Sequence, residues 1–221
     1  IRMERLIVLD TETTGLDVDS GHKIIEIGCI EIIDRNITDN SFHKYINPQR
    51  LIDEKAYEVH GISNEDLKDK PIFDDIIDEF ALYISDSPLI IHNAPFDLGF
   101  LKSEYIQSNH DEASLENSRE IIDTLKIARK ASPGKRNTLD ALCSRYSVDN
   151  TDRSLHGALL DAQLLANVYL RMTQGQTLIK GLSETHVDTN HDTNTIIENR
   201  KAKIIYADTQ EIEEHEKYFK N

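Results

Sequence analysis

Residues 6–16 read LIVLDTETTGL, an apolar run that ends in two carboxylates, Asp10 and Glu12. The β-branched residues of the run and the glycine that closes it predict a strand. Because side chains alternate along a strand, Val8, Asp10 and Glu12 point to one face if the strand extends through Thr11. Both carboxylates then project from the strand end, where open α/β sheets bind ligands. A pair of solvated turn acids is the alternative.

The second polar block is residues 90–101 (IIHNAPFDLGFL), in which Asp97 lies just inside a predicted helix start. Asn93 is a good N-cap residue, and the proline that follows suits a first turn. An acid in the first turn is favoured by the helix dipole even without a function. The neighbouring Phe96 and Phe100 indicate a buried environment, which favours a metal ligand over a purely structural acid.

The third polar block is LHGALLDA, residues 155–162. His156 and Asp161 are five residues apart, which is about 140° of helix rotation once a full turn is removed, so the two cannot share a helix face. We therefore expect His156 on a loop beside Gly157, and Asp161 on the helix that follows. A lone histidine is more often a surface or core residue. His156 is a candidate proton carrier only because the acidic blocks accompany it.

The chemistry of these blocks points to a metal. Carboxylates that follow apolar strands are costly to bury unless a positive charge meets them. Oxygen ligands of this kind suit Mg²⁺ or Mn²⁺. The sequence therefore predicts a metal-dependent reaction.

The bulk composition limits the class of protein. A chain of 221 residues with 38% hydrophobic content can build one sizeable core and an appendage. It has two cysteines, Cys29 and Cys143, no charged lead before an apolar signal stretch, and no apolar run near the roughly 20 residues that cross a bilayer. We expect a soluble protein of the reducing cytoplasm without a membrane partner.

The net charge is −15, which argues against a protein that finds nucleic acid by bulk attraction. If the substrate is a nucleic acid, a partner would deliver it. The basic-rich stretch around SPGKRN is the kind of surface that phosphate contacts need, although a solvated helix end is the simpler explanation. Its residues are Lys126, Arg129, Lys130, Lys135 and Arg136.

The order of predicted elements indicates an α/β fold with one mixed five-stranded sheet and helices on both faces. Strands are expected at 5–9, 23–33, 41–47, 89–92 and 120–123, and helices at 73–84, 95–107, 124–131, 138–146 and 157–172. Turn chemistry at Asn36 and at the Asp39-Asn40 pair predicts an antiparallel meander at the start.

The pattern changes after Thr173. Residues 183–195 are polar and lack an apolar period, which is typical of a flexible linker. Residues 196–221 regain apolar positions and read as a short segment that becomes ordered on a partner. The expected division is an enzyme domain at 1–175, a flexible linker at 176–195 and a partner-binding segment at 196–221.

Beyond these local features, the three polar blocks resemble the Exo I, Exo II and Exo III motifs of the DEDDh family of 3′–5′ exonucleases. The resemblance extends along the chain through GHKIIEIG (21–28), VHGI (59–62), DKP (69–71), PGKRNTLDALCSRY (133–146) and LHGALLDAQLLANVYL (155–170), and is closest to the proofreading subunits of bacterial DNA polymerase III. It implies a ribonuclease H-like fold, two divalent cations, Mg²⁺ or Mn²⁺, and removal of mispaired 3′ nucleotides from DNA.

The resemblance also implies roles for single residues. Asp10, Glu12, Asp97 and Asp161 match the metal-binding carboxylates of the family, and His156 matches its general base. His60 matches a residue that contacts the terminal nucleotide, while Thr13, Gly15 and Leu16 would pack on its base and sugar. Lys55 stands where relatives often carry an acid, and we include it as a candidate substrate contact.

Partners follow from the same resemblance. The family implies a complex with the polymerase alpha subunit, bound through residues 196–221, and with a small theta-like third subunit. Residues 176–182 (QTLIKGL) lie where the family carries a weak clamp-binding peptide, although Lys180 and Gly181 replace its apolar end.

Two other functions use the same features. A stand-alone DEDDh nuclease of RNA or oligonucleotides would keep the chemistry and change the substrate. A non-catalytic scaffold for the polymerase would keep the tail and lose the chemistry, which the complete acid set argues against.

Overall fold

The computed structural model describes residues 4–174, whose five strands form one mixed sheet in the order β3-β2-β1-β4-β5. The strands are β1 (Arg5–Thr13), β2 (Ile24–Ile33), β3 (Asn36–Tyr45), β4 (Leu89–Ile91) and β5 (Ile121–Asp123). β1, β2 and β3 are antiparallel neighbours, whereas β4 is parallel to β1 and β5 is parallel to β4. The predicted mixed sheet with an antiparallel start is confirmed.

Helices surround this sheet. In the described part of the chain they are α1 (Glu54–His60), α2 (Asn64–Leu67), α3 (Phe73–Ile84), α4 (Ala94–Gln107), α5 (Ser114–Asn117), α6 (Thr124–Ala131), α7 (Leu139–Arg145) and α8 (Ala158–Met172), with a 3-10 turn at Val18–Ser20. The five predicted helices agree with α3, α4, α6, α7 and α8 to within one residue at each end. The short helices α1, α2 and α5 were not predicted, because each buries a single residue and so has no apolar period.

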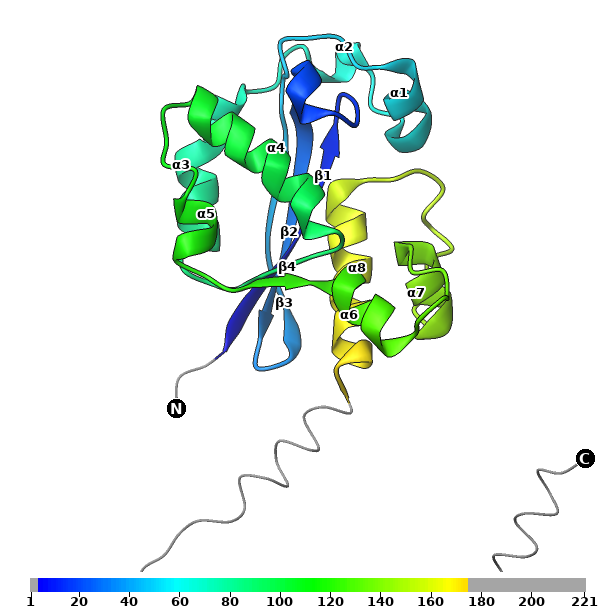
Figure 1. The fold of residues 1–221 in the computed structure, drawn as a ribbon. Coiled ribbons are helices and arrows are strands. Elements are labelled where there is room, and N and C mark those ends of the chain that lie inside the picture. Colours follow the sequence, from blue (N-terminus) through cyan, green and yellow to red (C-terminus); the bar gives the residue numbers. More distant parts are fainter. Residues whose placement is uncertain (1–3, 175–221) are drawn as a thin grey trace, which may run out of the picture. The chain divides into compact units, whose positions relative to one another are not determined.

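Helices cover both faces of the sheet (Figure 1), and an apolar cluster fills the space on each face. Ile7 and Leu9 of β1 pack with side chains of α3 and α4, while Leu6 and Val8 pack with those of α6, α7 and α8. Each such buried aliphatic side chain contributes about 1.5–3 kcal/mol. β1 is therefore a central strand whose two faces look toward different helices.

β1 is longer than the predicted strand at 5–9. It continues to Thr13 because β2 supplies a pairing partner that far, with Thr11 opposite Ile27 and Glu12 opposite Glu26. The condition that the strand should pass Thr11 is met, so Asp10 and Glu12 follow Val8 on the α8 side of the sheet.

The connection between β2 and β3 is tighter than the sequence suggested. Asn36 and the Asp39-Asn40 pair were expected in turns before a strand at 41–47, but all three lie within β3. The chain reverses at Asp34 and Arg35, whose φ angles of +47° and +66° suit a two-residue hairpin turn. β3 is an edge strand with one buried side chain among its ten residues, so it lacks the alternation that marks a strand.

The start of α4 also differs from expectation. Asn93 makes no side-chain cap, because it has left-handed backbone angles (φ +69°, ψ +51°) rather than the extended angles of a capping residue. Its backbone N–H instead donates to Asp123 Oδ1 at 3.3 Å. This bond ties the start of α4 to the end of β5, and Pro95 lies in the first turn as predicted.

The start of α8 lies against β2. Glu26 accepts a hydrogen bond from the Ala158 backbone N–H at 3.1 Å, and its other carboxylate oxygen bonds His43 Nε2 at 2.7 Å. Two residues along the strand, a Cβ on Gly28 would come within 2.3 Å of the Ala158 carbonyl carbon. β2 thus both caps the helix and leaves room for its backbone.

The tail predictions fall outside the described residues. These are the linker at 176–195, the clamp-binding peptide at 176–182 and the polymerase-binding segment at 196–221. The domain division therefore stays a prediction. Among residues 4–174, none of the helices has the length and apolar character needed to span a membrane.

Replacing Gly28 with Ala should lower the free energy of unfolding by about 1–3 kcal/mol, because the added methyl group must displace the start of α8. Urea denaturation would measure the change. Gly99→Ala is the matched control, since a Cβ there, inside α4, meets nothing within 4 Å. That change should raise stability by about 0.5–1 kcal/mol. Equal stability of Gly28→Ala and the parent protein would contradict the close approach.

Candidate active site

A pocket of about 1160 Å³ opens where β1 ends and where α4 and α8 begin. The ten residues to which the family resemblance gives a role all line it: Asp10, Glu12, Thr13, Gly15, Leu16, Lys55, His60, Asp97, His156 and Asp161. They come from distant parts of the chain, and the fold brings them together.

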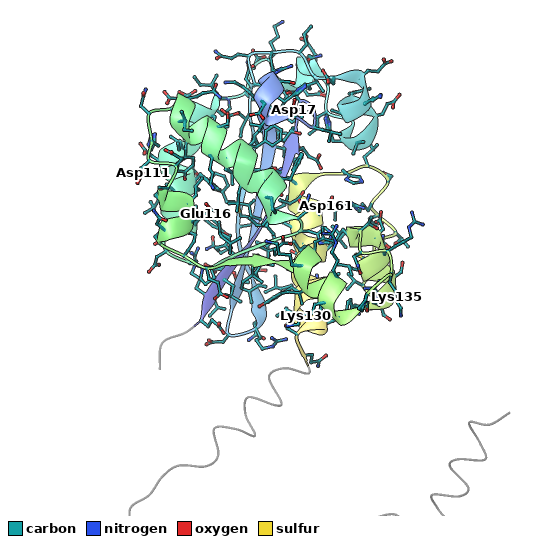
Figure 2. The ribbon with its side chains drawn as sticks, viewed as in Figure 1. Asp17, Asp111, Glu116, Lys130, Lys135 and Asp161 are labelled. Atoms are coloured by element: carbon teal, nitrogen blue, oxygen red, sulfur yellow. The ribbon has the colours of Figure 1, made fainter. Side chains whose placement is uncertain are left out.

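The alternation of β1 distributes its polar side chains between two helices. Thr11 points toward α4 and donates its hydroxyl hydrogen to Asp97 Oδ1 at 2.7 Å. Glu12 points the opposite way, toward Asp161 at the start of α8, which Figure 2 labels. The end of one strand therefore connects carboxylates from helices on opposite faces of the sheet.

His156 lies on the loop before α8, as predicted. Its Nδ1 atom is 3.6 Å from Asp161 Oδ2. Glu12, His156 and Asp161 each offer a ligand atom within 4.8 Å of the others, a spacing that a metal ion can bridge. The loop is fixed to α1, because the His156 backbone N–H donates to the Val59 carbonyl at 3.1 Å.

Burial and mutual repulsion set the protonation of the acids. Burial, together with the neighbouring Asp161 and Glu26, raises the pKa of Glu12 to about 8. Burial likewise raises the pKa of Asp97 to about 7, against the hydrogen bond from Thr11. The pKa of Asp10 is raised well above its ordinary value by burial and by Asp97 and Glu12. Crowded carboxylate oxygens that resist ionisation form a donor set suited to divalent cations.

His60 is buried in the same pocket, at the end of α1. Its Nδ1 atom accepts the Ile62 backbone N–H at 3.0 Å. The Nε2 atom therefore carries the proton of the neutral ring, and it has no hydrogen-bond partner of good geometry among the described residues. Burial lowers the pKa of His60, which favours this neutral form. An unpaired buried donor is suited to a substrate oxygen.

Two charged residues that the sequence analysis missed belong to the site. Arg153 forms ion pairs with Asp161 and with Asp140, both at 2.6 Å. The signal in the sequence was slight: Arg153 lies three residues before His156, and Asp140 lies in the quoted block 133–146.

The basic stretch is divided by the fold. Arg129, Lys135 and Arg136 line the pocket, whereas Lys126 and Lys130 do not. Figure 2 shows Lys130 and Lys135 near α6 and α7, on the opposite side of the molecule from Asp111 and Glu116. His92 also lines the pocket, and its Nδ1 atom is bonded to the Thr124 hydroxyl at 2.9 Å.

Comparison with protein families assigns the chain to an exonuclease family. The RNase_T family model, described as Exonuclease, matches residues 7–169. The chain is 48% identical over 220 residues to the DNA polymerase III subunit epsilon of Salmonella typhimurium, covering 96% of this chain and 90% of that protein. It is 47% identical over 217 residues to the same subunit of Rickettsia felis, covering 97% and 95%.

Solved structures with the same fold are also nucleases. Exonuclease X in complex with 5′ overhanging duplex DNA is 28% identical, with a TM-score of 0.61, and the match covers 78% of this chain and 93% of that one. The nuclease domain of 3′hExo, a DEDDh family member bound to rAMP, is 16% identical, with a TM-score of 0.68 and the same coverage. The second likeness concerns the fold alone.

The fold, the acid set and the family match define a 3′–5′ exonuclease of the DEDDh type with a ribonuclease H-like sheet. Family membership implies dependence on a divalent metal. Within this class, the chain belongs to the family of bacterial DNA polymerase III epsilon subunits.

The raised carboxyl pKa values predict how the metal-free protein responds to pH. A carboxyl group whose pKa is higher in the folded state than in the unfolded state stabilises the fold at low pH, and this contribution is lost as pH rises through the folded values, here about 7 and 8. Between about pH 5.5 and pH 8.5 the melting temperature should fall by roughly 5 °C. Calorimetry in a chelating buffer would measure this, and added Mg²⁺ should restore the loss at the high-pH end.

The double variant Glu12→Gln, Asp97→Asn is the control for that titration. It removes two of the three shifted groups and leaves Asp10, while keeping the shape of the pocket, so its melting temperature should depend less on pH. The same pH dependence in the variant and the parent would assign the effect to other groups.

Proposed function

We propose that this chain proofreads DNA replication as the exonuclease subunit of a bacterial DNA polymerase III. It would hydrolyse the 3′-terminal phosphodiester of single-stranded or frayed DNA and release deoxynucleoside 5′-monophosphates. The observation that carries the proposal is the convergence of four carboxylates and His156 in one pocket of a chain that matches epsilon subunits over nearly its whole length.

In this proposal the four carboxylates hold two divalent cations, Mg²⁺ or Mn²⁺. The residues are Asp10, Glu12, Asp97 and Asp161. When bound, the cations supply the positive charge that stabilises the attacking and leaving oxygens of the phosphodiester. The raised pKa values support this role, because carboxyl groups that lack a counter-charge hold their protons and a cation relieves that cost.

His156 would act as the general base. Its side chain is 44% exposed, so an attacking water can reach it from the pocket. Burial of part of the ring and the charge of Arg153 lower its pKa, and the imidazole is therefore neutral near pH 7 and able to accept a proton.

The 3′-terminal nucleotide would bind on the α1 side of the pocket. Leu16 is 84% exposed, although it is apolar, and it offers a surface on which a base can pack. Thr13 and Gly15 bring backbone next to that surface, and His60 Nε2 provides an unpaired donor for a substrate oxygen. Lys55, with the basic rim residues of the α6–α7 side, would meet phosphates.

The partners in this proposal are DNA 3′ ends, the polymerase alpha subunit bound through residues 196–221, and a small theta-like subunit. The sliding clamp would bind weakly through residues 176–182. A net charge of −15 gives the free enzyme little attraction for DNA, so tethering to the polymerase would supply a high local concentration when a mismatch frays. The protein would work in the bacterial cytoplasm beside replicating DNA.

Replacing His156 with Ala should reduce the rate of terminal nucleotide release by about 10²–10⁴-fold, because the attacking water loses its proton acceptor. The measurement is digestion of a labelled primer with a mispaired 3′ end, with and without Mg²⁺. Asp10→Asn should abolish the metal-dependent rate. His110→Ala, a histidine outside the pocket that pairs with Asp78, should leave the rate unchanged. A full rate in His156→Ala would remove the proposed base.

The same assay separates the alternatives. Faster release from a mispaired DNA end than from a paired one supports proofreading, whereas a preference for a ribonucleotide end would support the stand-alone nuclease of RNA or oligonucleotides. A parent protein without nuclease activity that still binds the polymerase would support the scaffold.

A further inference from the structure

The guanidinium group of Arg153 occupies the acidic pocket at the place where Asp161 enters it. Its Nε donates to Asp161 Oδ1 and one terminal nitrogen donates to Asp161 Oδ2, both at 2.6 Å. The side chain of Arg153 is 5% exposed and that of Asp161 is 4% exposed. The pair is therefore a buried two-bond fork, the strongest arrangement available to these groups.

The other end of the same guanidinium lies at the rim of the pocket. Its remaining terminal nitrogen donates to Asp140 Oδ1 at 2.6 Å. The Asp140 side chain is 57% exposed, so this second anchor is in contact with water. Arg153 is thus held between one carboxylate inside the acid cluster and one carboxylate outside it.

The terminal nitrogen of Arg153 that bonds Asp161 Oδ2 also contacts the imidazole of His156. It lies 3.1 Å from His156 Nδ1. Because a guanidinium has donors but no acceptor, Nδ1 must be the accepting nitrogen in this contact, and the proton of the neutral ring must sit on Nε2. While Arg153 stays in this position, neither nitrogen of His156 is free to accept a proton from water.

We propose that Arg153 is an internal counter-ion that competes with the divalent cation for Asp161, and that its displacement toward Asp140 frees His156. The inference rests on the proposed function, since it takes Asp161 as a metal-binding carboxylate. A guanidinium fork on both oxygens and a divalent cation a few ångströms away repel each other, so the two cannot share Asp161 in this geometry.

The competing explanation is a fixed structural role, in which Arg153 orients Asp161 for the metal and stays in place. The two roles predict opposite effects on metal affinity. If Arg153 competes, removing its charge strengthens metal binding. If it only orients Asp161, removing it weakens metal binding.

The test is a Mn²⁺ titration of the full chain without DNA, followed by electron paramagnetic resonance. Arg153→Gln should bind Mn²⁺ about fivefold more tightly than the parent, because the ion no longer displaces a buried ion pair. Arg153→Lys keeps the charge but cannot form the two-bond fork, so its affinity should be intermediate. Lys135→Gln removes a pocket-lining cation that makes no ion pair with the acids, and it should change the affinity less than twofold.

A spectroscopic readout follows the imidazole directly. In the parent protein, the ¹⁵N shift of His156 Nδ1 should move when Mg²⁺ is added, because the bond from Arg153 is lost. In Arg153→Gln the shift should already be at its metal-bound position before Mg²⁺ is added. Neither readout depends on nuclease activity.

Unchanged or weaker Mn²⁺ binding by both Arg153 variants would overturn the competition and leave the orienting role. A ¹⁵N shift of His156 that ignores Mg²⁺ would overturn the release of the imidazole. Failure of the proposed function itself looks different: the parent and the variants would all bind no Mn²⁺, even with a deoxynucleoside 5′-monophosphate present.

Discussion

The burial of several carboxylates in one pocket is the constraint on which the rest of the structure depends. Three of the four acids hold their protons more tightly than in water, because burial and neighbouring negative charge oppose ionisation; these are Asp10, Glu12 and Asp97. Such a cluster costs stability that the two apolar clusters on the faces of the sheet must offset. Arg153 reduces the cost at the fourth acid, Asp161, by meeting it with a positive charge.

The geometry of the cluster comes from a simple property of strands. Consecutive residues of β1 face opposite sides, so Thr11 reaches α4 while Glu12 faces α8. Both helices begin at the same end of β1, and each brings its acid in the first turn, where the helix dipole favours negative charge. On the β2 side, Glu26 and Gly28 fix the start of α8. The acids are thus held by backbone elements rather than by loops.

The sequence was sufficient to predict the elements that pack against the core and the residues whose type is fixed by metal chemistry. Apolar periodicity predicted the bounds of α3 and α8 to within one residue. The acids were identified because oxygen ligands are what a divalent metal site requires. The sequence was insufficient where a tertiary contact decides the structure. The edge strand β3 buries one side chain, so its polar start looked like a turn. The backbone N–H of Asn93 bonds Asp123 instead of forming a standard cap, and the role of Arg153 depends on two acids that only the fold brings into contact with it.

The link between α1 and the loop before α8 joins the side of the pocket proposed to bind the substrate to the proposed general base. Val59 accepts the His156 backbone N–H, and the next residue, His60, faces the same pocket. At the residue after His60, a Cβ on Gly61 would come within 2.5 Å of the Leu155 side chain. A shift of this seven-residue helix, about two turns long, would therefore move the loop that carries His156 together with His60. Packing changes at α1 can therefore reposition His156 and His60 together, without a substitution at either histidine or at the acids.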